Sequence, residues 1–132
     1  MPLLKNGTEP RIVTVTSSAH HMTPIIKFSD PHLRKKYSPW RAYAQSKLAN
    51  FYFSLGLSRK LANANSPIKS FSAHPGLAQT NLQVETAKQG GAGRSGKISE
   101  DAVMKFGMSA LDGAMPQLRA ALDPKAKSGQ FF

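Results

Sequence analysis

Tyr43 and Lys47 lie one helical turn apart in the segment Tyr43-Ala44-Gln45-Ser46-Lys47. At this spacing two side chains share one face of a helix, with roughly 5–6 Å between their Cβ atoms. An ammonium held that close favours the phenolate form of a tyrosine. The pair therefore predicts a tyrosine that can exchange a proton with a bound molecule as a general acid or base.

Two predicted strands flank the helix that carries this pair. Residues 11–16 are a β-branched run that stops at Ser17 and Ser18, and residues 67–73 form a second short run followed by the turn His74-Pro75-Gly76. The helix itself is predicted over about 40–64. A strand, a helix and a second strand form a βαβ unit, in which ligands bind beyond the carboxyl ends of the strands. The serines, the helix pair and the Pro-Gly turn are therefore candidates for one site.

Three ordered motifs resemble the short-chain dehydrogenase/reductase family over about residues 11–132. They are Thr16-Ser17-Ser18 after a hydrophobic strand, Tyr43-Ala44-Gln45-Ser46-Lys47-Leu48-Ala49-Asn50, and His74-Pro75-Gly76-Leu77-Ala78-Gln79-Thr80. The phrasing Ser18-Ala19-His20 and the ending Gly129-Gln130-Phe131-Phe132 are similar to the retinol-dehydrogenase-like branch. The resemblance implies an α/β fold, a partial Rossmann-type doubly wound parallel sheet that forms the C-terminal half of the family's domain.

The resemblance also implies roles for individual residues. Ser18 would hydrogen-bond the oxygen of an alcohol or carbonyl substrate, with Ser17 as the competing choice. Tyr43 would exchange the proton, and Lys47 would assist Tyr43 and contact the nicotinamide ribose. The backbone after Pro75, together with the Thr80 hydroxyl, would hold the nicotinamide carboxamide. The implied cofactor-binding residues at this turn are Pro75, Gly76, Leu77 and Thr80. The implied cofactor is NAD or NADP, and the implied substrate is a small-molecule alcohol or carbonyl compound.

The chain departs from the family pattern in its first ten residues, and this departure bears on whether it is active alone. Family members begin with a strand and a Gly-rich turn that seats the cofactor pyrophosphate on a helix N-terminus. Residues 1–10 here read instead as the tail of a helix that stops at Gly7, and neither Asn6 nor Asn50 matches the family's catalytic asparagine. Residues 1–132 are therefore predicted to be a single partial domain, inactive as an isolated fragment. A noncatalytic remnant, or an interaction module that uses the helix at 40–64, is the alternative.

The charge balance raises a further alternative. The net charge is +11, which favours phosphates, nucleic acid or an anionic membrane surface as partners. The cations are scattered, however, and the run Arg34-Lys35-Lys36 lies between Pro31 and Pro39 rather than on a helix with interleaved aromatic residues. We therefore predict no nucleic-acid partner, and a basic nucleic-acid-binding protein is the weaker alternative function. The sequence has no cysteine and no apolar stretch of the ~20 residues that span a bilayer, so a cytoplasmic protein without a membrane span is predicted.

Two other motifs are set aside. Gly91 to Lys97 has the spacing of a phosphate-binding P-loop, but Ile98 replaces the Ser or Thr that would hold Mg²⁺. His20 and His21 are adjacent in a strand-like segment, so their rings are expected on opposite sides, and no metal site is predicted.

The remaining element predictions concern helices and one strand edge. The helix at 40–64 is expected to bury a broad apolar face that includes Leu48, Phe51 and Tyr52. A further helix is predicted over about 99–122 with Ser99 as its N-cap, and Pro116 indicates a break or a new first turn. The strand at 11–16 is expected to leave one edge open, which predicts marginal stability or self-association, with a homo-oligomer as one form.

Overall fold

The computed structural model describes residues 2–79, 103 and 105–132. Its helices and strands, in chain order, are α1 (Pro2–Lys5), β1 (Arg11–Val15), the 3₁₀ helix η1 (Ser18–Met22), α2 (Pro39–Asn63), β2 (Lys69–Ala73) and α5 (Ala110–Leu122). The predicted strands at 11–16 and 67–73 and the helix at 40–64 are therefore confirmed, each within two residues at either end. No helix in the described part of the chain is both long and apolar enough to cross a membrane.

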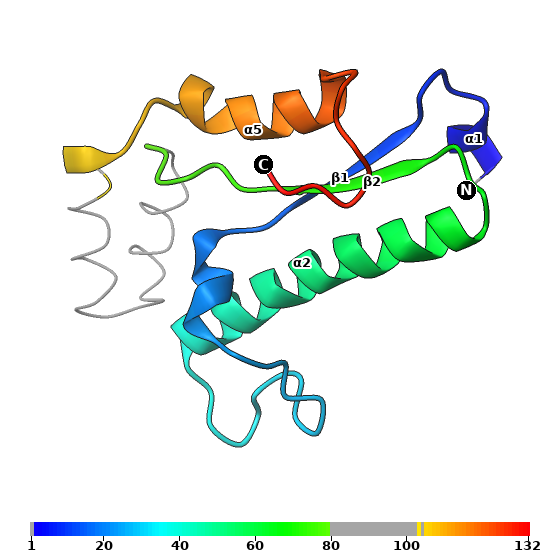
Figure 1. Ribbon diagram of the computed structural model, residues 1–132. Coiled ribbons are helices and arrows are strands. Elements are labelled where there is room, and N and C mark those ends of the chain that lie inside the picture. Colours follow the sequence, from blue (N-terminus) through cyan, green and yellow to red (C-terminus); the bar gives the residue numbers. More distant parts are fainter. Residues whose placement is uncertain (1, 80–102, 104) are drawn as a thin grey trace.

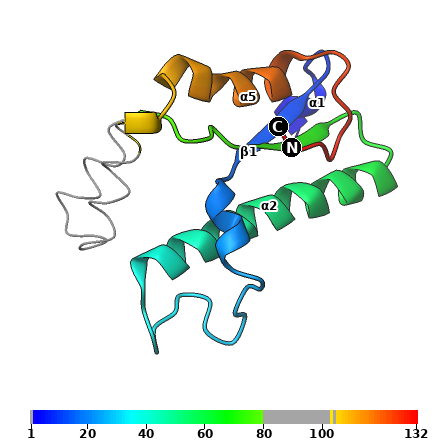
Figure 2. The same ribbon diagram turned by 60° about the vertical axis from the view of Figure 1, so that its left-hand side comes forward.

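The two strands run parallel, with Arg11 opposite Lys69 and Val15 opposite Ala73. The C-terminal tail lies along the other edge of β2, where Ser72 forms a parallel bridge with Phe131. Helix α2 covers one face of these strands and α5 covers the opposite face, as the two views in Figure 1 and Figure 2 show. Helices on both faces of a parallel sheet are the arrangement of a doubly wound α/β fold, which confirms the predicted fold class as a partial Rossmann-type unit.

The hydrophobic core lies between the sheet and α5, and it is small. Its fully buried members are Phe71, Ala73 and Ala120, joined by Ala126, and Val13 and Phe132 pack against them. Arg11 ties the end of α5 to this core, because its guanidinium donates hydrogen bonds to the carbonyl oxygens of Ala120 at 3.1 Å and Asp123 at 2.9 Å. The carbonyls at a helix C-terminus have no partner within the helix, so this contact both satisfies them and fixes the helix on β1.

The buried residues of α2 are mostly small or polar. Its buried members are Ala44, Gln45, Leu48, Ser54 and Ser58. Ser54 and Ser58 meet serines from other elements, with Ser54 Oγ 3.3 Å from Ser70 Oγ and Ser58 Oγ 2.9 Å from Ser128 Oγ. The expectation of a broad apolar face is wrong for Tyr52, whose side chain is 49% exposed. The small side chain of Ser54 lets α2 approach β2 closely at Ser70, whereas the aromatic Tyr52 stays half-exposed.

The predicted continuous helix over 99–122 is wrong. Residues 80–102 and 104 lie outside the described part of the chain, and with them Ser99 and the Gly-rich stretch. Residues 107–109 are not helical, because Met108 pairs with the segment after β2. Helix α5 starts at Ala110, where the Ser109 hydroxyl accepts a hydrogen bond from the Asp112 N–H at 3.1 Å. Pro116 lies inside α5 rather than at a break.

Candidate active site

The end of β1 is fastened to the turn of α2 that carries Lys47. Thr16, only 1% exposed, donates its hydroxyl to the Lys47 carbonyl oxygen at 2.7 Å. Asn50, one turn further along α2, donates its side-chain amide to the Val15 carbonyl oxygen at 3.0 Å. Two side chains therefore hold the carboxyl end of the strand against the helix. The sequence motifs contain both residues, but only the contacts show this positioning role.

Tyr43 and Lys47 lie on one side of α2, as their spacing predicts. The Lys47 Nζ atom is 5.5 Å from the centre of the Tyr43 ring, a distance at which an ammonium interacts with an aromatic face. Trp40 meets the same ring edge-on, at 6.2 Å between ring centres. Both Tyr43 and Lys47 are half-buried. The phenol is thus held between an indole and a cation, with part of its surface open to a second molecule.

The two serines after β1 have different surroundings. Ser17 caps η1, and its hydroxyl accepts the Ala19 N–H at 3.2 Å. Ser18 is exposed, and its hydroxyl has no hydrogen-bond partner within the described residues. Since η1 packs against α2, Ser18 stands beside the helix that carries Tyr43 and Lys47. Of the two candidates, Ser18 has the hydroxyl that is available to a ligand.

The turn after β2 has a fixed shape. Gly76 has a φ of 65°, in the left-handed region, and its N–H is bonded to Nδ1 of His74 at 3.0 Å. Beyond it, the Met108 N–H donates to the Leu77 carbonyl at 2.8 Å, and the Gln79 N–H donates to the Met108 carbonyl at 2.9 Å. Pro75, Gly76 and Leu77 are thus described, whereas Thr80 lies outside the described residues.

This pairing identifies a residue that sequence reasoning missed. In a parallel bridge, two residues of one segment bond the partner segment, and the residue between them points its N–H and C=O away from that partner. Ala78 is that residue, and neither its N–H nor its C=O has a partner within the described chain. One free donor beside one free acceptor is the complement of a primary amide. No sequence signal distinguishes Ala78 from its neighbours, because the selection depends on Met108 from a distant segment.

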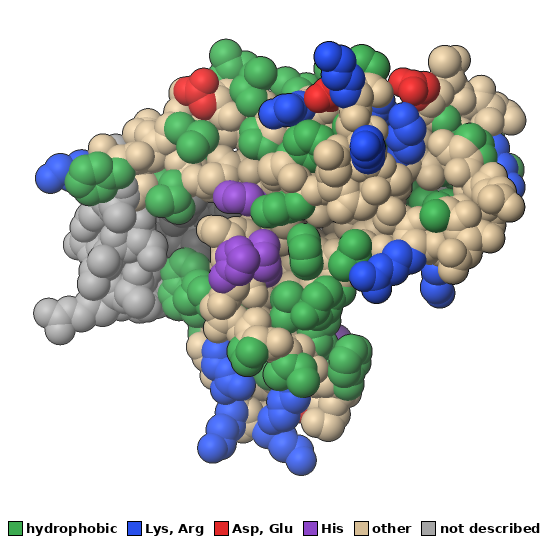
Figure 3. All heavy atoms as spheres, viewed as in Figure 1, with side chains coloured by type: hydrophobic (Ala, Val, Ile, Leu, Met, Phe, Trp, Pro, Cys, Tyr) green, Lys and Arg blue, Asp and Glu red, His purple; other side chains and the backbone are tan. Residues whose placement is uncertain are grey.

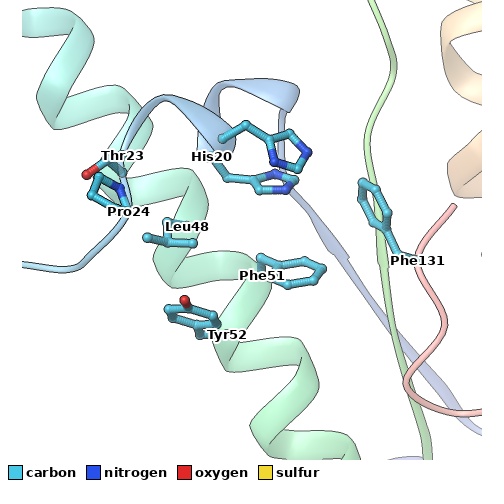
Figure 4. A pocket seen from close by; sticks show the side chains of 8 residues that line it. His20, Thr23, Pro24, Leu48, Phe51, Tyr52 and Phe131 are labelled. Carbon is cyan, nitrogen blue, oxygen red and sulfur yellow. The ribbon is translucent and has the colours of Figure 1, made fainter.

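A cavity of about 400 Å³ lies between η1, α2 and the C-terminal tail (Figure 4). It is lined mainly by rings, and its lining includes His20, His21, Phe51, Tyr52 and Phe131. The expectation that the two adjacent histidines point apart is wrong, because both belong to a 3₁₀ helix and their ring centres are 4.0 Å apart. Figure 3 shows histidine side chains among hydrophobic ones in the middle of this face.

His74 extends the same group of rings from the end of β2. Its ring stacks on Phe131 at 5.4 Å between centres. Burial lowers the pKa of His74, and the neighbouring His20 and His21 lower it further because a second positive charge beside them is unfavourable. Within the described residues, no three His, Asp or Glu side chains are grouped so that they could hold a metal ion.

The basic run Arg34-Lys35-Lys36 is folded around an acidic residue. Asp30, 8% exposed, accepts the N–H groups of Arg34 at 2.8 Å and Lys35 at 3.2 Å. These bonds lower the pKa of Asp30, chiefly through the Arg34 N–H. Gln45 on α2 fixes the same loop by bonding the Lys27 N–H at 2.9 Å and the Pro31 carbonyl at 2.7 Å. The backbone of the basic run is therefore part of a loop that Asp30 and Gln45 hold in place.

Known proteins similar to this chain include dehydrogenases and oxidoreductases. No protein-family model matches the chain. It is 43% identical over 76 residues to polyprenol dehydrogenase of Mus musculus, covering 58% of this chain and 22% of that protein. It is 40% identical over 79 residues to retinol dehydrogenase 11 of Homo sapiens, covering 60% of this chain and 24% of the relative. A crystal structure of an uncharacterised protein from Mycobacterium paratuberculosis aligns with a TM-score of 0.62 and 35% identity, over 92% of this chain and 36% of that one.

The fold is part of a parallel α/β unit. Its candidate site residues follow the carboxyl ends of the strands or lie on the adjacent helix. The matches show that the chain is related to the short-chain dehydrogenases, including retinol dehydrogenases, which confirms the family predicted from the three motifs. The chain spans about a quarter of the length of the curated relatives that it matches.

Proposed function

We propose that this chain carries the Ser-Tyr-Lys part of the active site of an NAD(P)-dependent short-chain oxidoreductase, which interconverts a small-molecule alcohol and a carbonyl compound. The observation that carries the proposal is the fastening of β1 to α2. The Thr16–Lys47 and Asn50–Val15 hydrogen bonds, at 2.7 and 3.0 Å, fix the segment that contains Ser18 beside the segment that contains Tyr43.

Each residue has a chemical task in this proposal. Reduction of a carbonyl places negative charge on its oxygen, and that oxygen needs a hydrogen-bond donor and a proton. Ser18 supplies the donor, since its hydroxyl is exposed and without another partner in the described chain. Tyr43 supplies the proton from its phenol. Lys47 stabilises the phenolate that remains, through its positive charge near the ring.

The dinucleotide supplies the hydride when it is bound, and the turn after β2 fits its nicotinamide end. The carboxamide of nicotinamide has one donor group and one acceptor, and Ala78 offers the matching N–H and C=O. We therefore assign Ala78, with Pro75, Gly76 and Leu77 shaping the turn, to the carboxamide. Thr80 remains a prediction from the motif alone. Lys47, at the same end of the sheet, is assigned to the ribose hydroxyls.

We further propose that the 132 residues assayed alone bind nicotinamide weakly and do not turn over substrate. Tight dinucleotide binding uses several backbone N–H groups and a helix N-terminus around the pyrophosphate. The sequence pattern predicts no Gly-rich turn between a strand and a helix for this purpose, because the residues before Gly90 are polar rather than apolar.

A chimera tests the function directly. Residues 11–132 replace the matching part of human retinol dehydrogenase 11, and oxidation of NADH or NADPH is followed with a set of aldehydes. We expect carbonyl reduction by the chimera. Tyr43→Phe should lower kcat by about 10²–10⁴-fold, because general acid catalysis contributes that much. Lys47→Met should also lower kcat, since the charge beside the phenol is removed.

Tyr52→Phe is the matched control. It removes the same hydroxyl from the same helix, but at a side chain that is 49% exposed and on another side of α2. It should leave kcat unchanged. Equal activity of Tyr43→Phe and Tyr52→Phe in a folded, cofactor-binding chimera would refute the proposed role of Tyr43.

A further inference from the structure

The side chain of His74 holds the turn that follows β2. The Gly76 N–H donates to the Nδ1 atom of His74 at 3.0 Å, across two residues of the chain. Asparagine and aspartate make the same bond in an Asx turn, where a side-chain oxygen accepts the N–H two residues further on. His74 fills that role with a ring nitrogen. The ring is itself held in place, because it stacks on Phe131 at 5.4 Å between centres.

The bond from Gly76 restrains the least constrained residue of the turn. Glycine adopts both signs of φ about equally, so the left-handed conformation of Gly76, at a φ of 65°, needs a restraint from outside the residue. A Cβ at this position would lie 2.9 Å from the Met108 Cε atom, so Met108 packs directly on the glycine. Met108 also bonds the backbone of Leu77 and Gln79, on either side of Ala78. The conformation of Gly76 therefore sets the path by which the chain reaches Met108 with Ala78 between the two bonded residues.

The bond also defines which nitrogen of His74 carries a proton. An N–H donates only to an unprotonated ring nitrogen, so the neutral ring of His74 carries its proton on Nε2. His20 on η1 is the opposite case, because its Nδ1 atom lies 2.6 Å from the Ser17 carbonyl oxygen and must be the donor. In a protonated imidazole both nitrogens are donors. Protonation of His74 therefore sets its N–H against the Gly76 N–H and removes the bond.

We propose that His74 is a positioning residue for the cofactor: its neutral imidazole holds the turn that presents Ala78, and protonation of the ring releases that turn. The effect on the cofactor rests on the proposed function, whereas the release of the turn does not. Asparagine in this place would accept the Gly76 N–H at every pH. With histidine, Ala78 holds the carboxamide less tightly as the pH falls and His74 becomes protonated.

The surroundings of His74 favour its neutral form. Burial lowers its pKa most, and His20 and His21 on η1 lower the pKa further through their positive charges. Among the described residues, no other acidic or basic side chain contributes to this shift. On the tail, an oxygen of Phe132 accepts the His74 backbone N–H at 2.9 Å. In the 132-residue chain this oxygen is part of a carboxylate, which acts in the opposite direction without reversing the shift. The turn is therefore held at neutral pH and released below the ordinary histidine pKa of 6.5.

NMR of the ¹⁵N-labelled 132-residue chain, without cofactor, tests the release. At about pH 8, long-range ¹H–¹⁵N spectra of the imidazoles should show His74 protonated on Nε2 and His20 protonated on Nδ1. On titration to about pH 5, the amide signals of Gly76 and Ala78 should move with the same midpoint as the His74 ring. A His74 ring protonated on Nδ1 at high pH, or Gly76 and Ala78 signals that ignore the titration of His74, would overturn the positioning role. This readout needs no variant to fold.

Two variants separate the bond from the ring. His74→Asn keeps an acceptor and does not titrate, whereas His74→Phe keeps a ring against Phe131 and has no acceptor. Titration with NAD⁺ at both pH values should show binding by the wild type that is about tenfold weaker at the lower pH, roughly the value of one hydrogen bond. His74→Asn should bind equally at both, and His74→Phe weakly at both. General attraction of the phosphates to a more positive chain would change in the opposite direction.

The outcomes distinguish this role from the proposed function. Equal binding by folded His74→Asn and His74→Phe, or tighter binding by the wild type at the lower pH, would overturn the positioning of the cofactor by His74. Absence of NAD⁺ binding at either pH, with the Gly76 amide still following the His74 ring, would instead refute the nicotinamide site. Control of the turn by His74 would then stand without a cofactor.

Discussion

At the scale of single residues, the site depends on side chains whose work is to position others. Thr16 bonds the backbone carbonyl of Lys47, and so holds the part of α2 from which the Lys47 side chain projects. Asn50 does the same for the end of β1. The chemistry of a proton-exchanging tyrosine tolerates little displacement, because a shift of about 1 Å in the reacting groups can cost about 10²-fold in rate.

Thr16→Val should test this positioning role. The change keeps the volume of the buried side chain and removes the hydroxyl that bonds the Lys47 carbonyl, so we expect a loss of about 1–3 kcal/mol in the free energy of unfolding. Thr14→Val is the matched control, on the same face of β1 and without a side-chain hydrogen bond among the described residues. Urea denaturation followed by circular dichroism measures both. Equal stabilities of the two variants would show that the Thr16 bond contributes nothing.

His74 predicts how stability depends on pH. Burial, followed by the charges of His20 and His21, lowers its folded-state pKa below the ordinary value of 6.5. The unfolded chain therefore binds more protons than the folded chain between these two pKa values, so stability is full above about pH 6.5 and is lost as the pH falls through that window. His74→Asn keeps an acceptor for the Gly76 N–H and does not titrate. Thermal melts from pH 8 to about 5 should fall less steeply for this variant than for the wild type.

At the scale of elements, close approach between segments is what shapes the nicotinamide end of the site. A Cβ added at Gly113 in α5 would lie 2.6 Å from the Cβ of Ala78 and 3.3 Å from the Pro75 carbonyl oxygen. Helix α5 can therefore support the turn after β2 only because position 113 has no side chain. The turn that presents Ala78 is thus set by a helix more than thirty residues further along the chain.

A pair of glycine substitutions tests this packing. Gly113→Ala should destabilise the chain by about 1–3 kcal/mol, the usual cost of overpacking. Gly56→Ala is the control in α2, where an added Cβ would have no atom within 4 Å. It should stabilise the chain by about 0.5–1 kcal/mol, because alanine is the better helix former. Denaturant midpoints measure both effects. Stabilisation by both substitutions would show that α5 does not press on the turn.

Some helices and strands could be predicted from the sequence and others could not. Hydrophobic periodicity and the motifs were sufficient for β1, α2 and β2, because those segments have strong local signals and are linked by short-range patterns. The buried face of α2 was not predictable in the same way. Ser54 and Ser58 are inside because Ser70 and Ser128 meet them there, and a distant hydroxyl leaves no trace in the local sequence. Helix α5 was misplaced at its start for the same reason, since Met108 leaves the helical path to pair with Ala78.

At the scale of the whole molecule, the described part of the chain has polar residues after its strands and a row of outward backbone groups on β1. We propose the first set for a nicotinamide and a carbonyl oxygen. The three motifs led to that proposal, whereas the self-association expected from an open strand edge stays a prediction. Which backbone groups face outward could come only from the ladder register, because a shift of one residue would exchange the two sets.

The most direct test of the central claim is an NMR titration of the ¹⁵N-labelled chain with NADH. We predict saturable shifts of the backbone amides of Ala78 and Leu77 and of residues around Lys47, with weak affinity. Lys47→Ala should reduce these shifts, whereas Lys36→Ala, in the loop closed by Asp30, should not. Shifts confined to Arg34-Lys35-Lys36, or no shifts at the strand ends up to about 10 mM cofactor, where even ligands that gain only ~3 kcal/mol bind, would contradict a nicotinamide site in this chain.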